Sequence, residues 1–118
     1  MLFCFDIDGS LTDWPEELGA IMRALHKDGH KVEILSGHVG TVVTESTVAR
    51  KKKLLSSLGV GDAYSRLVIF ASPDNHVADQ KVSYMEQHKA SALFDNDKAN
   101  VRAARKAGFL ALRVGSKK

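Results

Sequence analysis

The chain has 118 residues, 44% of them hydrophobic and 26% charged, and these values predict one ordinary globular domain over residues 1–118. Two prolines and nine glycines exclude a fibrous or disordered chain. A net charge of +3 and a sequence pI of about 9.1 suit anionic ligands without requiring nucleic-acid binding.

The sequence also predicts a cytoplasmic protein without membrane partners. No apolar stretch approaches the roughly 18 residues of a membrane span, and the N-terminus lacks the basic start of a signal peptide. Cys4 is the single cysteine, so no disulfide can form within one chain, which suits a reducing compartment. Because Cys4 lies inside an apolar run, we expect a small buried side chain there.

Short apolar runs alternate with longer amphipathic runs along the chain. The apolar runs predict five strands, at Leu2–Phe5, Lys31–Leu35, Leu67–Ala71, Ala92–Phe94 and Phe109–Val114. The amphipathic runs predict four helices, from Pro15 to a stop at Gly29, from about Thr47 to a stop at Gly59, at Val77–His88 and at Asn100–Ala107. Residues 39–46 are crowded with threonines and β-branched residues and give no clear prediction.

This alternation predicts the fold class. The strands lack a regular polar alternation, as expected when both faces of a sheet are covered. We therefore expect a three-layer α/β fold, with an open, mainly parallel five-stranded sheet and helices on both faces. In such sheets, ligands bind beyond the carboxyl ends of the strands, where the strand order reverses.

Polar side chains stand at the ends of the predicted strands. They are Asp6 and Asp8 after the first strand, Ser36 after the second, Asp95 and Asp97 after the fourth, and Lys81 in the helix that precedes the fourth. If the strands are parallel, these groups meet at one edge of the sheet, and unpaired carboxylates there would be costly without a cation or a reaction to serve.

This set of groups predicts phosphoryl chemistry. Clustered carboxylates repel one another and favour a hard cation, and oxygen ligands select Mg²⁺. The metal, a lysine and a serine hydroxyl would neutralise and position a phosphoryl group. One aspartate could then act as a nucleophile and the other as a general acid and base.

Four segments resemble the motifs of the haloacid dehalogenase-like (HAD) phosphohydrolases, in the family's order. Residues 6–13 (DIDGSLTD) resemble the first motif, and residues 32–37 (VEILSG) resemble the second. Lys81 is placed like the lysine of the third motif, and residues 93–108 resemble the acidic fourth motif and its helix. The resemblance implies a Mg²⁺-dependent phosphatase that hydrolyses a phosphomonoester through an aspartyl-phosphate.

The resemblance also implies a role for each matching residue. Asp6 would be the nucleophile, Asp8 the acid and base, and Lys81 would hold the nucleophile and the transferring charge. The Ser36 hydroxyl and the Gly37 amide would bind phosphoryl oxygens. The magnesium ligands would be Asp6, Asp8, Asp95 and Asn96.

The sequence departs from the family pattern in two ways. Asn96 stands where the family usually has a second acidic residue, so either Asn96 ligates the metal without charge or Asp95 or Asp97 replaces it. No segment is long enough for a cap domain. An open site suits a large phosphorylated substrate such as a nucleic-acid end, or closure by another subunit in a homo-oligomer.

Two alternative functions remain open at this point. Asn96 and the basic residues 50–53 (RKKK) are also consistent with a weakened HAD-like protein that binds phosphate or nucleic acid without turnover. A phosphate-accepting receiver domain is less favoured, because receivers lack an Asp-x-Asp pair after the first strand.

Several single features have an ordinary structural interpretation, which we favour. The basic run would be a solvated helix face, and Asp97 would cap the last helix rather than bind metal. His38 would be a loop residue, and Trp14 would pack near the start of its helix rather than stack on a base.

Overall fold

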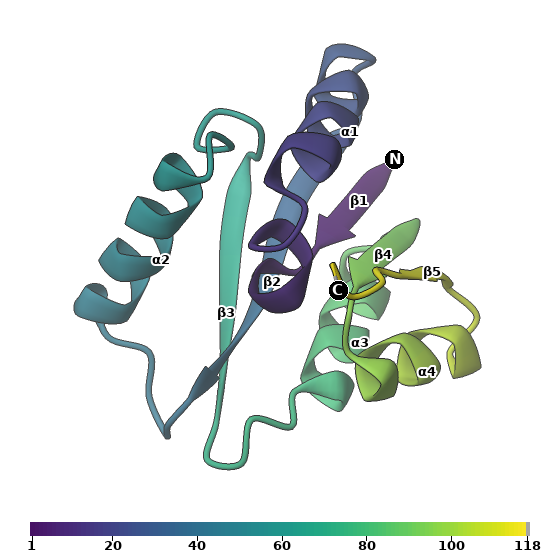
Figure 1. The fold of residues 1–118 in the computed structure, drawn as a ribbon. Coiled ribbons are helices and arrows are strands. Elements are labelled where there is room, and N and C mark those ends of the chain that lie inside the picture. The colour runs from purple at the N-terminus through teal and green to yellow at the C-terminus, as the bar shows by residue number, and fades with distance from the viewer. Residues whose placement is uncertain (118) are drawn as a thin grey trace.

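The computed structural model describes residues 1–117, which form one parallel sheet between two helical layers (Figure 1). The strands are β1 (Leu2–Phe5), β2 (Lys31–Val39), β3 (Arg66–Ser72), β4 (Ala92–Asp95) and β5 (Leu110–Arg113). The helices are α1 (Pro15–Lys27), α2 (Glu45–Ser57), α3 (Ala78–Gln87) and α4 (Lys98–Lys106). The segment η1 (Ile7–Leu11) is a kinked turn in which Asp8 and Gly9 have non-helical backbone angles. The predicted three-layer α/β fold is confirmed, and residues 1–117 contain no cap domain.

The strand order is β3-β2-β1-β4-β5, and every neighbouring pair is parallel. The chain therefore adds β2 and β3 on one side of β1, then crosses back and adds β4 and β5 on the other side. The order reverses beside β1, whose carboxyl end leads into Asp6. A ligand site is expected at this place in an open α/β sheet.

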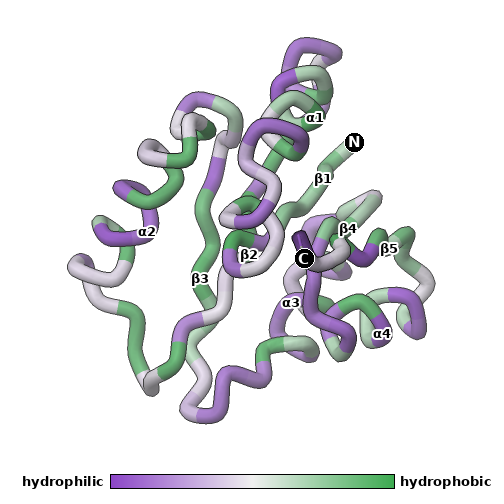
Figure 2. The backbone as a smooth tube through the Cα atoms, viewed as in Figure 1, coloured by the Kyte–Doolittle hydropathy of each residue, from purple (hydrophilic) through white to green (hydrophobic). Residues whose placement is uncertain are grey.

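Alternate side chains of the central strands pack on opposite faces of the sheet. Cys4, Leu35 and Leu93 belong to a core with Tyr84 and Met85 of α3. The other core contains Phe5 and Ile34 and is covered by α1 and α2, with members that include Leu18, Met22 and Leu55. Hydrophobic colour follows the strands and the inner sides of the helices in Figure 2. Cys4 is buried, as expected, and burial raises the pKa of its thiol to about 12.

The largest difference from the sequence prediction is the length of β2. Pairing with β3 continues from Ser36 opposite Ile69 to Val39 opposite Ser72. Ser36, Gly37 and His38 therefore lie inside a strand, and the predictions of a strand end at Ser36 and of a loop histidine at position 38 are wrong. The backbone hydrogen bonds of β3 extend the strand despite its polar residues.

The helix starts follow local capping chemistry. The Thr44 hydroxyl accepts a hydrogen bond from the Thr47 amide at 3.2 Å and begins α2. Asp97 Oδ1 accepts from the amides of Ala99 and Asn100 at 2.8 and 3.1 Å, so α4 begins at Lys98, two residues before the predicted start. The prediction that Asp97 is an N-cap is confirmed.

None of the helices in residues 1–117 is both long enough and apolar enough to cross a membrane.

A buried polar pair joins the sheet to α3. Glu33 of β2 is buried, and its Oε1 accepts a hydrogen bond from the Tyr84 hydroxyl at 2.5 Å. Burial, followed by the bond to Glu33, raises the pKa of Tyr84 to about 12, so the phenol stays a donor over the working range of pH. The pair satisfies a carboxylate that would otherwise be buried without a donor.

We predict that Tyr84→Phe lowers the free energy of unfolding by about 1–3 kcal/mol, because it leaves the Glu33 carboxylate without its donor. Urea denaturation followed by circular dichroism measures the change. Tyr64→Phe is the matched control, since the Tyr64 hydroxyl makes no hydrogen bond within residues 1–117. Equal losses in the two variants would contradict the prediction.

Candidate functional site

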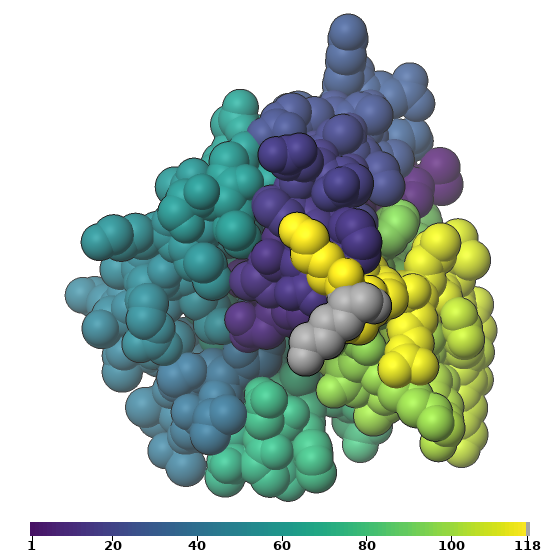
Figure 3. Space-filling model, viewed as in Figure 1, coloured from purple at the N-terminus to yellow at the C-terminus, as the bar shows by residue number. Residues whose placement is uncertain are grey.

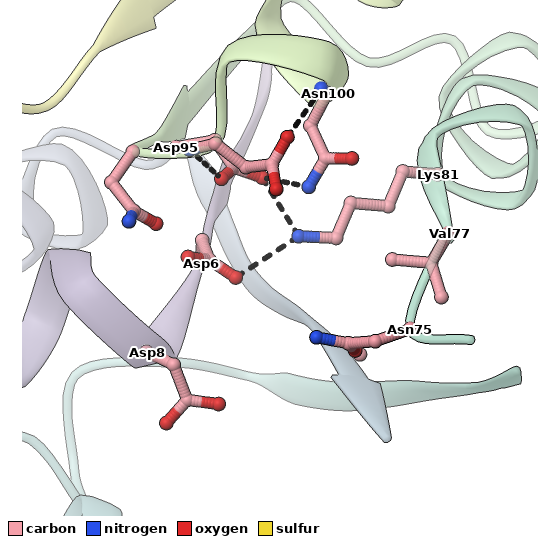
Figure 4. A pocket seen from close by; sticks show the side chains of 10 residues that line it. Asp6, Asp8, Asn75, Val77, Lys81, Asp95 and Asn100 are labelled. Atoms are coloured by element: carbon pink, nitrogen blue, oxygen red, sulfur yellow. Dashed lines mark hydrogen bonds and ion pairs between the residues drawn. The ribbon is translucent and has the colours of Figure 1, made fainter. Parts of the chain in front are cut away.

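A pocket of about 240 Å³ lies at the carboxyl ends of β1, β2 and β4 (Figure 4). Seven of the residues predicted from the sequence line it, namely Asp6, Asp8, Gly37, Lys81, Asp95, Asn96 and Asp97. Asn75, Val77 and Asn100 complete the lining. The parallel sheet thus brings side chains from both ends of the sequence to one place, as predicted, whereas the chemical roles expected for them stay predictions.

The Lys81 ammonium lies between two carboxylates at the centre of the pocket. Its Nζ donates to Asp6 Oδ1 at 3.0 Å and to Asp95 Oδ2 at 2.7 Å, and the side chain is 1% exposed. Burial lowers the pKa of Lys81, but the attraction of Asp6 and Asp95 outweighs burial and leaves the pKa raised. Lys81 is therefore a fixed positive charge.

The sequence of α3 explains why this lysine is buried. Lys81 precedes Tyr84 and Met85 by three and four residues, so the three side chains share the helix face that packs on the sheet. The hydrophobic residues hold the face in place, and the lysine at the first turn reaches the edge where Asp6 and Asp95 end their strands.

Asp95 is completely buried, and hydrogen bonds engage both of its oxygens. Oδ2 accepts from Lys81 and from Asn100 Nδ2, the latter at 3.0 Å, and Oδ1 accepts from the Asp97 amide at 2.9 Å. Sequence reasoning missed Asn100. Its position in the first turn of α4, three residues after the N-cap, was the available signal.

Asp6 and Asp8 have different environments. Asp6 is buried, and burial, opposed by Lys81 and reinforced by Asp95, raises its pKa from 3.8 to about 7. Its second oxygen, Oδ2, is 3.4 Å from the Ser10 hydroxyl, a long hydrogen bond. Asp8 is exposed, and its carboxylate points away from Lys81 (Figure 4).

The turn after β1 requires a glycine. Gly9 has φ +81°, and a Cβ atom there would lie 2.2 Å from Asn96 Nδ2. The Asn96 side chain therefore rests against this turn at the edge of the pocket. A larger residue at position 9 would have to displace Asn96.

The Ser36 side chain lies on the face of β2 that α2 covers. There it contacts a lysine that we expected to be exposed to solvent. Lys51 of α2 is buried, and its Nζ donates to Ser36 Oγ at 2.8 Å. Lys52 and Lys53 are exposed, so the prediction of a solvated basic run is confirmed for them and wrong for Lys51. The signal was helical spacing, because Thr47, Lys51 and Leu55 recur every four residues and form the buried face of α2.

Residues 1–117 contain no group of three His, Cys, Asp or Glu side chains arranged to hold a metal ion. Asp95 is engaged by its hydrogen-bond donors, and Asp8 points outward. Within residues 1–117, the Asp8 carboxylate and Oδ2 of Asp97 accept no hydrogen bond, and Oδ2 of Asp6 accepts only the long one from Ser10. Magnesium coordination by Asp6, Asp8, Asp95 and Asn96 remains a prediction.

Trp14 packs against the C-terminal segment. Its indole Nε1 donates to the Gly115 carbonyl at 2.9 Å, and Lys117 Nζ lies 5.9 Å from the ring centroid. Figure 3 shows the C-terminal residues lying across the N-terminal part of the chain. The favoured prediction of a packing role for Trp14 agrees with these contacts.

Comparison with known proteins finds similarity at the level of the fold. No family model and no curated protein matches the chain. A universal stress protein from Archaeoglobus fulgidus, solved in complex with dAMP, aligns with a TM-score of 0.66 and 13% identity over 98% of each chain. A universal stress protein from Burkholderia pseudomallei aligns with a TM-score of 0.63 and 13% identity over 96% of this chain and 94% of its own. A third, in complex with cAMP, aligns with a TM-score of 0.59 and 16% identity over 98% and 97%.

These structures correct the family assignment. The similar structures are universal stress proteins, so the assignment to the haloacid dehalogenase-like family is wrong. The assignment as an enzyme, a Mg²⁺-dependent phosphatase with an aspartyl-phosphate intermediate, falls with it, as does the alternative of a weakened member of that family. The physical reason is that any parallel α/β sheet gathers polar strand ends at one edge, so short acidic motifs there do not specify one family.

We predict that Lys81→Met lowers the free energy of unfolding by about 3–5 kcal/mol at pH 8, because Asp6 and Asp95 would then be buried without their shared cation. Chemical denaturation measures the loss. Lys53→Met is the control, since Lys53 is exposed, and it should change stability by less than about 0.5 kcal/mol. A loss no larger than that of the control would contradict the role of the bridge.

The raised pKa of Asp6 predicts a pH-dependent stability. The folded state favours the protonated carboxyl, so this stabilisation is complete below pH 3.8 and is lost as the pH rises through about 7. Between pH 4 and pH 8, the free energy of unfolding of Asp6→Asn should rise by on the order of 3 kcal/mol relative to that of the unmodified protein. Parallel stability curves for the two proteins over this range would contradict the prediction.

Proposed function

We propose that this protein binds a nucleoside monophosphate, with the phosphate in the pocket at the carboxyl edge of the sheet and a divalent cation beside it. The observation that carries the proposal is the lining of this pocket, in which the Lys81 ammonium is shared by Asp6 and Asp95 and the Asp8 carboxylate is exposed. The proposal concerns binding and includes no chemical step.

The charges of the pocket explain why a cation is part of the proposal. Four carboxylates, those of Asp6, Asp8, Asp95 and Asp97, line the pocket with one ammonium, so the pocket alone would repel a phosphate. Mg²⁺ commonly binds one or two carboxylates and completes its shell with phosphate oxygens and water. Asp6 Oδ2 and Asp8 are the oxygens best placed to hold it, and when bound it would neutralise the phosphate.

The sizes of the hollows suggest where each part of the ligand would lie. The pocket of about 240 Å³ is below the usual volume for a whole nucleotide-sized ligand. A second hollow of about 470 Å³, lined in part by Gly9, Asp13 and Arg113, shares Asn96 with it. The phosphate would occupy the first and the nucleoside the second.

The fold comparison gives independent support for the ligand class. Two universal stress proteins of this fold were solved with dAMP and with cAMP. Their identity to this chain is 13% and 16%, so they motivate the choice of ligand and do not establish it.

We also infer a cytoplasmic location. The support is Cys4, the single cysteine, which is a free and buried thiol. This inference does not affect the ligand proposal.

Isothermal titration calorimetry with AMP, in the presence of Mg²⁺ and after its removal with EDTA, tests the proposal. We predict binding that depends on Mg²⁺ and weakens about tenfold or more in Asp8→Asn, which removes an exposed charged metal ligand. Asp79→Asn is the matched control, because Asp79 is an exposed aspartate at the start of α3 outside the pocket.

Two results would overturn the proposal. One is the absence of AMP binding with and without Mg²⁺, and the other is equal affinity in Asp8→Asn and Asp79→Asn. A 5′-phosphorylated oligonucleotide is titrated in parallel. Binding of the oligonucleotide alone would replace the small ligand with a nucleic-acid end.

A further inference from the structure

Lys51 is a buried cation outside the Lys81 bridge. The residue is 8% exposed, and the one hydrogen bond of its Nζ goes to a neutral group, the Ser36 hydroxyl, at 2.8 Å. An ammonium has three donor hydrogens, so this bond uses one of them. The other two have no acceptor within residues 1–117.

The two buried lysines of the fold differ in how their charge is balanced. Lys81 has a carboxylate on each side, at 3.0 and 2.7 Å. The other ion pairs within 4.0 Å in residues 1–117 involve Arg23, His30 and His76, and none involves Lys51. A buried ammonium without a carboxylate costs several kcal/mol, so a fold that keeps one is expected to use its charge.

Lys51 neighbours the pocket without lining it. Burial lowers the pKa of Lys51, and the groups that perturb it next include Asp8, Asp6 and Lys81, all of which line the pocket. Its partner Ser36 lies in β2 just beyond the last β1 pairing, that of Phe5 with Ile34, and is therefore beside the chain that leads from β1 into Asp6 and Asp8. Lys51 therefore lies next to the pocket on the α2 side of the sheet, outside its lining, while Lys81 enters the pocket from the α3 side.

We propose that the Lys51 ammonium, oriented by the Ser36 hydroxyl, is a binding residue for a phosphate oxygen of the ligand. Lys81 is unsuited to this role, because two of its donors and its charge are already committed to Asp6 and Asp95. Lys51 has donors that are not used and no carboxylate within ion-pair distance in residues 1–117, which suits recognition of an anionic group. This inference rests on the proposed function and adds the residue that recognises the phosphate.

The proposal makes a paired prediction for Lys51→Met. AMP affinity in the presence of Mg²⁺ should fall about tenfold or more, because a charge-assisted hydrogen bond to phosphate is lost. The melting temperature should stay the same or rise, because the variant no longer buries an ammonium that has no ion-pair contact. A lysine with a merely structural role would instead lower the melting temperature when removed.

Three further measurements separate recognition of the phosphate from other effects. Lys51→Arg should retain most of the affinity, since it keeps the charge. Adenosine should bind equally to the unmodified protein and to Lys51→Met. Lys53→Met, which removes an exposed lysine from the same helix, should bind AMP normally.

The outcomes of this experiment are distinguishable. Failure of the unmodified protein to bind AMP overturns the proposed function and the role of Lys51 with it. Normal AMP affinity in Lys51→Met, with binding intact in the unmodified protein, overturns the role of Lys51 alone. Equal losses for AMP and adenosine, or a lower melting temperature, would make Lys51 a structural residue and overturn its role in phosphate recognition.

Discussion

The ammonium of Lys81 between Asp6 and Asp95 is the interaction on which the edge of the sheet depends. Asp6 ends the central strand β1 and Asp95 ends its neighbour β4, so two carboxylates are forced together by the parallel pairing of these strands. Without a cation they would repel in a buried place. Lys81 comes from α3 and is held there by the packing of Tyr84 and Met85, so one bridge links two strands and a helix.

This bridge also decides which groups are left to bind a ligand. Lys81 is committed to Asp6 and Asp95, and Asp95 also accepts from Asn100, so these groups form the floor of the pocket. Asp8, at the exposed side, and Lys51, beneath Ser36, are the charged groups whose partners are incomplete. A ligand that carries both an anion and a cation, such as a phosphate with Mg²⁺, would satisfy both of them.

The fold comparison shows that short motifs at a site do not identify the family to which a fold belongs. The order of short motifs indicates the haloacid dehalogenase-like pattern, yet the similar solved structures named above are universal stress proteins. A parallel α/β sheet presents the same edge in many families, and short polar segments at that edge are compatible with several chemistries. Function must therefore be tested at the individual residues of the pocket.

Hydrophobic patterning in the sequence was sufficient to determine the three-layer fold, because strand and helix periods are local properties of the chain. It also determined that Asp6, Asp8, Lys81, Asp95 and Asp97 would meet, since parallel strands end at one edge. Only the tertiary structure decided how these side chains are paired. It also placed Ser36 inside β2 and buried Lys51, contrary to the sequence predictions. Hydrogen-bond partners and burial depend on which helix face meets the sheet, and that is settled by packing between segments distant in the sequence.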